Sequence, residues 1–375
     1  MARTLFDKIW DAHRVKTLPS GEDLIAIDRV FLHERTGSVA LESLLESGRD
    51  LLDASRVFCT MDHIVSTDEG RGRNDARTPG GDVFITATRT AAGRTGINLI
   101  DVDSADQGIV HVISPELGIA QPGLSLVCPD SHTCSQGALG AAAWGIGSTD
   151  AEHAMATGTL RLKKPPQMRI RVDGRLSEGI TAKDLILHII GTLGAGGAKR
   201  CAVEFYGEAI EALDIEARLT VCNMAVEMAA FTALIAPDAI TTAYLKGRRY
   251  APSGPDWDQA VRAWQTLFTD EAASFDHEHI FDARQIGHTV TWGTSPGEAA
   301  PLSGQAGQSD YMDLENGIAL LGLPIGGAFI GSCTNARISD LRAAATVLKG
   351  RKVAQGVTAI CVPGSMAVRR QAEDE

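Results

Sequence analysis

The sequence predicts an α/β protein with mostly parallel sheets, and three observations support this. Short apolar runs recur without strict alternation, and each ends in a tight polar turn before a stretch of helical character. Aromatic residues make up only 5% of the chain, which contains 39 glycines, so small aliphatic residues must fill the core and glycines the turns. At 375 residues, the chain is long enough for two or three domains.

Four segments show this strand-then-turn pattern clearly. We expect strands at residues 57–60, 124–128, 328–330 and 357–362, each followed by polar residues. The third is followed by a predicted helix over residues 339–349, which Gly350 can end. In parallel sheets ligands bind at the carboxyl ends of the strands, so these turns are the predicted location of a site.

Composition shifts mark two candidate domain boundaries. One is the run Lys163-Lys164-Pro165-Pro166, and the other lies around residues 294–308, which are rich in Gly, Ser and Pro. We therefore expect three domains, at residues 1–166, 167–289 and 290–375.

The charge of the chain argues against some classes of partner. A net charge of −12 and a pI near 5.3 give no basic footprint for nucleic acid or an anionic membrane. The sequence contains no apolar run near the roughly 20 residues that span a bilayer, and the first residues lack the apolar core of a signal peptide. We therefore expect a cytoplasmic protein with no nucleic-acid or membrane partner.

Two carboxylate–imidazole pairs follow predicted strands. Asp62 precedes His63, and Asp130 lies two residues before His132, with Ser131 between them. Such pairs suit proton transfer because a carboxylate fixes the tautomer of an imidazole and tunes its pKa. Each Asp could instead only cap a helix while the His packs, but the recurrence in the same setting favours function.

Asn223 and Glu227 lie four residues apart in an apolar segment. A helix would place both on one face, and we expect Glu227 to be buried with a partner or a function. From these residues alone, a structural ion pair is somewhat favoured over a site.

Cys333 is the most informative of seven cysteines. It lies in Gly331-Ser332-Cys333-Thr334-Asn335, where a tight turn leads into the predicted helix, and nearby backbone N–H groups would favour a thiolate. Such a thiolate could be a nucleophile or an iron ligand. The other cysteines form no CxxC pair and are expected to be free thiols.

Two further segments are expected to be structural. The glycine-rich residues 191–199 do not end in the Gly-Lys-Ser/Thr sequence of a phosphate-binding loop, so we expect a tight loop. Arg71, Arg73 and Arg77 could bind carboxylates, but a solvated loop is favoured.

Together these motifs resemble the aconitase superfamily, and within it the large subunits of isopropylmalate isomerases. The matching stretches run in family order through most of the chain: residues 60–63, 107–111, 130–133, 179–184, 222–224, 292–294 and 331–335. The resemblance implies three α/β/α domains around a [4Fe–4S] cluster, with a fourth domain on a separate small subunit. In this family an iron without a cysteine ligand acts as a Lewis acid on a hydroxy-diacid substrate.

The resemblance also implies roles for individual residues. Cys333 corresponds to the first cluster ligand, and Ser131 and Asn223 to substrate-binding residues. The catalytic residues implied are Asp62, His63, His111, Asp130, His132 and Glu227. The base that removes the carbon-bound proton is expected from the small subunit.

The sequence also departs from the family pattern. Two further cluster cysteines, expected in a CxxC, are not found after Cys333, and the remaining Cys361 lies in an apolar run. We therefore expect a C-terminally truncated or degraded copy whose third domain is partial, and which is inactive alone. Pro129 and Ala229 stand where the family usually has glycine, and residues 70–77 differ from its pattern.

The expected function is that of an isopropylmalate isomerase large subunit acting in leucine biosynthesis. Methylmalate (citraconate) and dimethylmalate hydratases are close alternatives. A clusterless interaction or RNA-binding relative is the alternative from another class, although the acidic charge weighs against RNA.

Overall fold

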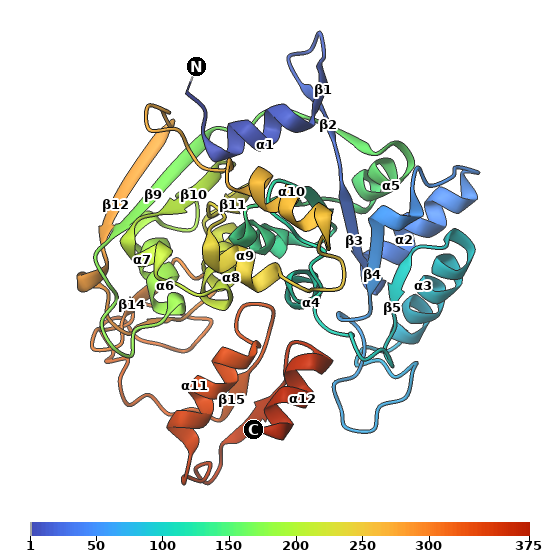
Figure 1. Cartoon of the computed structure of the whole chain (residues 1–375). Helices are drawn as coiled ribbons and strands as arrows, with labels where there is room; N and C mark the ends of the chain where they lie inside the picture. The colour runs from blue at the N-terminus through green and yellow to red at the C-terminus, as the bar shows by residue number, and fades with distance from the viewer. Residues whose placement is uncertain (1) are drawn as a thin grey trace.

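A five-stranded parallel sheet forms the centre of the N-terminal half in the computed structural model, which describes residues 2–375. Its strand order is β5-β4-β3-β6-β7, and every neighbouring pair is parallel. The strands are β3 (Arg29–His33), β4 (Val57–Thr60), β5 (Asn98–Ile100), β6 (Ser125–Cys128) and β7 (Ala142–Gly145). The helical segments around them are α2 (Glu34–Glu46), η1 (Ala54–Arg56), α3 (Gly81–Thr95), α4 (Val110–Glu116), η2 (Ser131–Leu139) and α5 (Ser148–Thr157). Figure 1 shows α2 and α3 covering the outer side of β3, β4 and β5.

This sheet is buried on both faces. Phe31 of β3 packs into one hydrophobic core, and its neighbours Val30 and Leu32 pack into another on the opposite face. Strands covered on both sides need continuous apolar runs rather than alternation, which is the pattern that the sequence shows. The predicted α/β class with parallel sheets is confirmed.

An antiparallel sheet and one helix flank this unit. The sheet has the order β1-β2-β8, from β1 (Arg14–Thr17), β2 (Asp23–Ala26) and β8 (Thr159–Leu162). Helix α1 (Leu5–His13) begins with a capping box between Thr4 and Asp7, and buries Leu5, Phe6, Ile9 and Trp10.

A second, four-stranded parallel sheet lies beside the first. Its order is β11-β10-β9-β12, from β9 (Gln167–Asp173), β10 (Ala202–Tyr206), β11 (Thr232–Leu234) and β12 (His277–Asp282). Its helical segments are α6 (Ala182–Leu193), α7 (Glu208–Glu211), α8 (Ile215–Met224), η3 (Ala225–Met228), α9 (Ala239–Leu245), α10 (Pro255–Trp264) and η4 (Ala283–Gln285). One core runs through both units, and a Cβ on Gly137 of η2 would lie 1.6 Å from the Ala233 carbonyl oxygen. Only glycine permits this close approach.

The C-terminal segment is less buried. It contains an antiparallel pair, β13 (Thr289–Thr291) with β14 (Ala299–Pro301), and a parallel pair, β15 (Gly327–Ile330) with β16 (Thr358–Cys361). Helices α11 (Ile338–Leu348) and α12 (Met366–Asp374) follow the last two strands, and they lie at the bottom of Figure 1, coloured red. Phe329 is 62% exposed and Ile360 53%, so these strands carry apolar side chains into solvent.

The four predicted strands are present within one or two residues of their expected ends, and α11 matches the expected helix at 339–349. Gly350 follows it with φ +75°, the left-handed conformation that ends helices. The loop expected at residues 191–199 is partly wrong, because α6 continues through Leu193 before the chain turns at Gly194. Apart from Thr289, the first residue of β13, each sheet is drawn from one of the three expected segments, but the shared core leaves the division into domains a proposal. Within residues 2–375, every helix is too short or too polar to cross a membrane.

Candidate active site

Asp130 is the centre of a network of histidines at the end of β6. It caps η2, where the backbone N–H of His132 donates to Asp130 Oδ1 at 2.7 Å. His111 Nε2 lies 2.9 Å from the same oxygen, and His63 Nε2 lies 3.0 Å from Oδ2. Burial acts to raise the pKa of Asp130, but His111, His132 and His63 together lower it, so the carboxylate stays ionised.

Asp62 and His63 form the second carboxylate–imidazole pair, directly after β4. Asp62 Oδ1 lies 2.7 Å from His63 Nδ1, and the backbone N–H of Val110 donates to Asp62 Oδ2 at 2.9 Å. Burial acts to lower the pKa of His63, but the carboxylates of Asp62 and Asp130 raise it to about 11. His63 is therefore a cation held between two carboxylates.

Glu34 supports this turn and was not anticipated from the sequence. At the start of α2, its fully buried carboxylate accepts hydrogen bonds from the backbone N–H groups of Asp62, His63 and Ile64. His33 stacks on His63 with ring centroids 3.6 Å apart. Both follow the apolar run of β3, so the strand-then-turn pattern that singled out Asp62 and Asp130 would have found them.

The side chains of His33, Glu34, Asp62 and His63 bring ligand-type atoms within 4.8 Å of one another. The Glu34 oxygens are already engaged by three backbone N–H groups, and both nitrogens of His63 face carboxylates. These contacts explain the cluster as a rigid support for His63 rather than a metal site.

His132 pairs with Glu227, which comes from the second sheet's side of the molecule. His132 Nε2 lies 3.1 Å from Glu227 Oε1. The nearby carboxylates of Asp130 and Glu227 raise the pKa of His132 to about 10, and the hydrogen bond to His132 lowers the pKa of Glu227. The pair is therefore an imidazolium and a carboxylate at neutral pH.

The expected geometry of Glu227 is corrected by the structure. Helix α8 ends at Met224, and Glu227 lies in the 3-10 turn η3 rather than on the same α-helical face as Asn223. Its side chain is 32% exposed, whereas Asn223 is fully buried. The turn ends at Ala229 with φ +64°, a conformation that costs a non-glycine residue about 1–2 kcal/mol.

Asn223 connects the histidine network to Cys333. Its Nδ2 donates to Ser135 Oγ at 2.8 Å and lies 3.4 Å from Cys333 Sγ, and Ser135 Oγ donates to the His132 carbonyl at 2.6 Å. Asn223 Oδ1 accepts from Thr334 Oγ1 at 2.8 Å. One hydrogen-bonded path therefore runs from His132 to the thiol.

The turn that carries Cys333 is held in an unusual conformation. Ser332 has φ +74°, and its hydroxyl accepts a hydrogen bond from the Thr334 backbone N–H. Backbone strain of this kind is concentrated at functional sites. Arg337, also missed in the sequence, is buried behind the turn and donates to the carbonyls of Thr334, Cys333 and His111.

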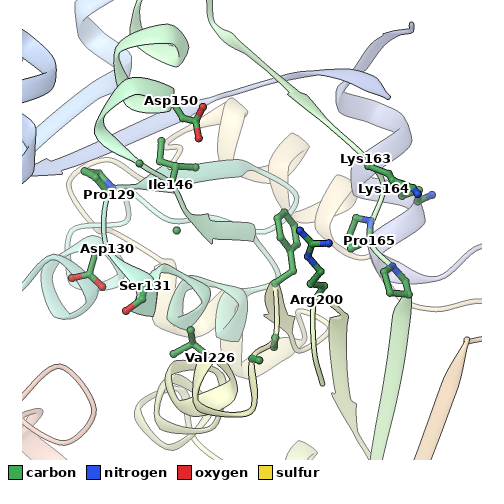
Figure 2. A pocket seen from close by; sticks show the side chains of 16 residues that line it. Pro129, Asp130, Ser131, Ile146, Asp150, Lys163, Lys164, Pro165, Arg200 and Val226 are labelled. Atoms are coloured by element: carbon green, nitrogen blue, oxygen red, sulfur yellow. The ribbon is translucent and has the colours of Figure 1, made fainter. Parts of the chain in front are cut away.

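Ser131 faces the larger of two cavities beside the site. The cavity has a volume of about 890 Å³ and extends from Asp130 and Ser131 to Lys163 and Arg200. Figure 2 shows Asp130 and Ser131 on one side, with Lys163 on the opposite side and Arg200 between them. A Cβ on the lining residue Gly145 would meet the Asp130 carbonyl oxygen at 2.6 Å, so glycine is required for the cavity wall to approach Asp130.

The structure brings the candidate residues into one region. Direct contacts join Asp62, His63, Asp130, His111, His132 and Glu227, and the path through Ser135 adds Asn223 and Cys333. The loop arginines lie outside it: Arg71 binds Gln107 and the Ser66 carbonyl, Arg73 pairs with aspartates 101 and 103, and Arg77 pairs with Asp68. They serve the loop's own structure.

The cysteines test whether an iron–sulfur cluster fits. A four-iron cluster is held by several cysteine thiolates. Among residues 2–375, Cys333 is the only cysteine that borders the site and is partly accessible, because Cys59, Cys128, Cys134, Cys201 and Cys222 are buried and Cys361 lies exposed on β16. These residues fit one ligand position and do not fit a whole cluster.

The comparison with known families agrees with this geometry. A model of the aconitase family (aconitate hydratase) matches residues 7–375, which is almost the whole sequence. The match spans every residue of the network described above.

Proposed function

Because the chain belongs to the aconitase family, we propose that it is the large subunit of a hydro-lyase that acts on a branched hydroxy diacid. The favoured reaction is that of 3-isopropylmalate dehydratase, which interconverts 2- and 3-isopropylmalate through isopropylmaleate in leucine biosynthesis. Members of this family generally bind a [4Fe–4S] cluster.

The observation that carries the proposal is the arrangement of His132. Two carboxylates, Asp130 and Glu227, hold it protonated. A hydrogen-bonded path through Ser135 and Asn223 connects this residue to the Cys333 thiol. A dehydratase needs a proton donor for the leaving hydroxyl at this position.

The chain's own residues can supply the acid that a dehydration requires. We assign His132 as the acid that gives its proton to the departing hydroxyl and takes it back when water adds to the alkene. Asp130 holds the three imidazoles in place, and Glu227 keeps His132 charged between turnovers. Ser131 is assigned to substrate binding because its hydroxyl lies beside the His132 ring, and Asn223 because its amide lies 3.4 Å from Cys333 Sγ.

Cys333 is assigned as one cluster ligand. A small subunit carrying a fourth domain is the proposed partner and the source of the base that removes the carbon-bound proton. A cytoplasmic location belongs to the same proposal.

A substrate panel tests this function. The holoenzyme, with its small subunit and cluster, is assayed for alkene formation from 3-isopropylmalate, methylmalate, dimethylmalate and citrate by ultraviolet absorbance. We expect the highest kcat/KM with 3-isopropylmalate. A preference for methylmalate or dimethylmalate would select one of the alternative hydratases.

Inactivity on every diacid, with the cluster shown to be intact by iron and sulfide analysis, would contradict the hydro-lyase assignment. It would favour the clusterless or non-enzymatic class.

A further inference from the structure

Lys183 has an unusual environment near the site. It lies in the first turn of α6, which a capping box between Thr181 and Asp184 begins. The side chain is half-buried, and its amine makes no hydrogen bond or ion pair with any of residues 2–375. Burial lowers the pKa of Lys183 from its ordinary value.

The lysine lines a second cavity on the Cys333 side of the site. This cavity has a volume of about 430 Å³ and is bounded by the end of β15 and the start of α11, including Ser332 and Asp340. Lys183 shares the wall of this cavity with Ser332 and Asn335, which lie on either side of Cys333 and Thr334 in the turn. It therefore belongs to the wall of the site.

The other basic side chains here are already engaged. His63, His111 and His132 all contact carboxylates, and Arg337 donates to three carbonyl oxygens behind the Cys333 turn. Asp340, the acidic residue that shares the cavity, is also engaged, since it accepts from Asn335 Nδ2 and from the Arg337 backbone N–H. Lys183 keeps all three of its donors for a ligand.

A half-buried ammonium group without a partner carries a desolvation free-energy cost, and an anion that binds it offsets this cost. We propose that Lys183 binds one carboxylate of the diacid substrate in the cavity beside Cys333. This inference rests on the proposed function, since a hydroxy diacid brings two carboxylates that need cationic partners. It assigns to Lys183 a role in substrate affinity rather than in proton transfer.

Two substitutions test the role in the holoenzyme. Lys183→Met keeps the length of the side chain and removes the charge, and we expect KM for 3-isopropylmalate to rise roughly 10- to 100-fold with kcat changed only a few-fold. Lys183→Arg should recover part of the affinity. Lys199→Met, at an exposed lysine, is the matched control and should leave both constants unchanged. An unchanged KM in Lys183→Met, or a loss confined to kcat, would overturn the proposal.

A labelling experiment separates this inference from the proposed function. The amine of Lys183 is acetylated with acetic anhydride and quantified by mass spectrometry, with and without saturating 3-isopropylmalate. Protection of Lys183 but not Lys199 supports the carboxylate site even if the enzyme does not turn over. Turnover without protection would remove Lys183 from the site while leaving the hydro-lyase assignment intact.

Discussion

The two sides of the candidate site are built in different ways. Asp62 and Asp130 follow strands β4 and β6, whose residues are all buried in a sheet covered on both faces. Cys333 follows β15, whose strand is mostly exposed and pairs only with the exposed β16. The histidine network is thus positioned by a hydrophobic core, whereas the thiol depends on local polar contacts.

Those local contacts lie at the turns and not along the strands. Thr220 Oγ1 donates to the Thr334 carbonyl at 3.0 Å, and the Ser339 backbone N–H donates to Glu216 at 2.9 Å. The Ile109 backbone N–H donates to the Gly364 carbonyl at 2.8 Å, which fixes the turn after β16. The C-terminal segment is attached through the turns at the ends of its strands, while apolar side chains of the strands face solvent.

The largest expected effect is a difference in stability between two phenylalanine substitutions, one on β3 and one on β15. Phe31 of β3 is fully buried, and Phe31→Ala should lower the free energy of unfolding of the 375-residue chain by about 3–5 kcal/mol. Phe329 of β15 is 62% exposed, and Phe329→Ala should change it by about 0.5 kcal/mol or less. Urea unfolding followed by tryptophan fluorescence measures both, with buried Trp144 as the reporter in the first sheet. Equal losses would show that the C-terminal strands are packed as well as the N-terminal ones.

A smaller effect is expected from the charge on His132, and it should be visible in the pH dependence of kcat/KM. With a pKa of about 10, His132 stays protonated through neutral pH, so the alkaline limb of kcat/KM should lie near pH 10. Glu227→Gln removes one of the two groups that raise this pKa, so His132 should lose its proton earlier and the limb should move down by roughly 1–3 pH units.

Glu208→Gln, at an exposed ion pair with Arg175, is the control and should leave the limb in place. An alkaline limb that Glu227→Gln does not move would mean that another group than His132 limits activity at high pH.

The sequence predicted the strands of both regions, the buried β4 and β6 as well as the exposed β15 and β16. The strands at residues 57–60 and 124–128 and the polar pairs after them were predictable, because parallel strands covered on both faces need continuous apolar runs that end abruptly. The helix after Cys333 was also predictable, because Gly350 can end it. The His63–Asp130 contact itself was not, because it joins residues 67 positions apart.

Other parts of the site depend on tertiary contacts that a sequence pattern does not contain. The α8 helix stops before Glu227, which lets that carboxylate reach His132 across the two units. The sequence analysis assigned no role to Arg337 or Lys183, and only their burial and the groups around them distinguish them. Glu34 could have been identified from the sequence, because it follows the apolar run of β3 in the same way as the predicted pairs follow theirs.

We propose His132 as the acid of a hydro-lyase whose histidine network is already organised in this chain. The most direct measurement is the rate of alkene formation from 3-isopropylmalate by holoenzyme carrying His132→Gln, alongside its iron and sulfide content. We expect a kcat lower by roughly 10²–10⁴-fold with the cluster content unchanged. Near-normal dehydration by the variant, with the small subunit present, would contradict it and remove His132 from the chemistry.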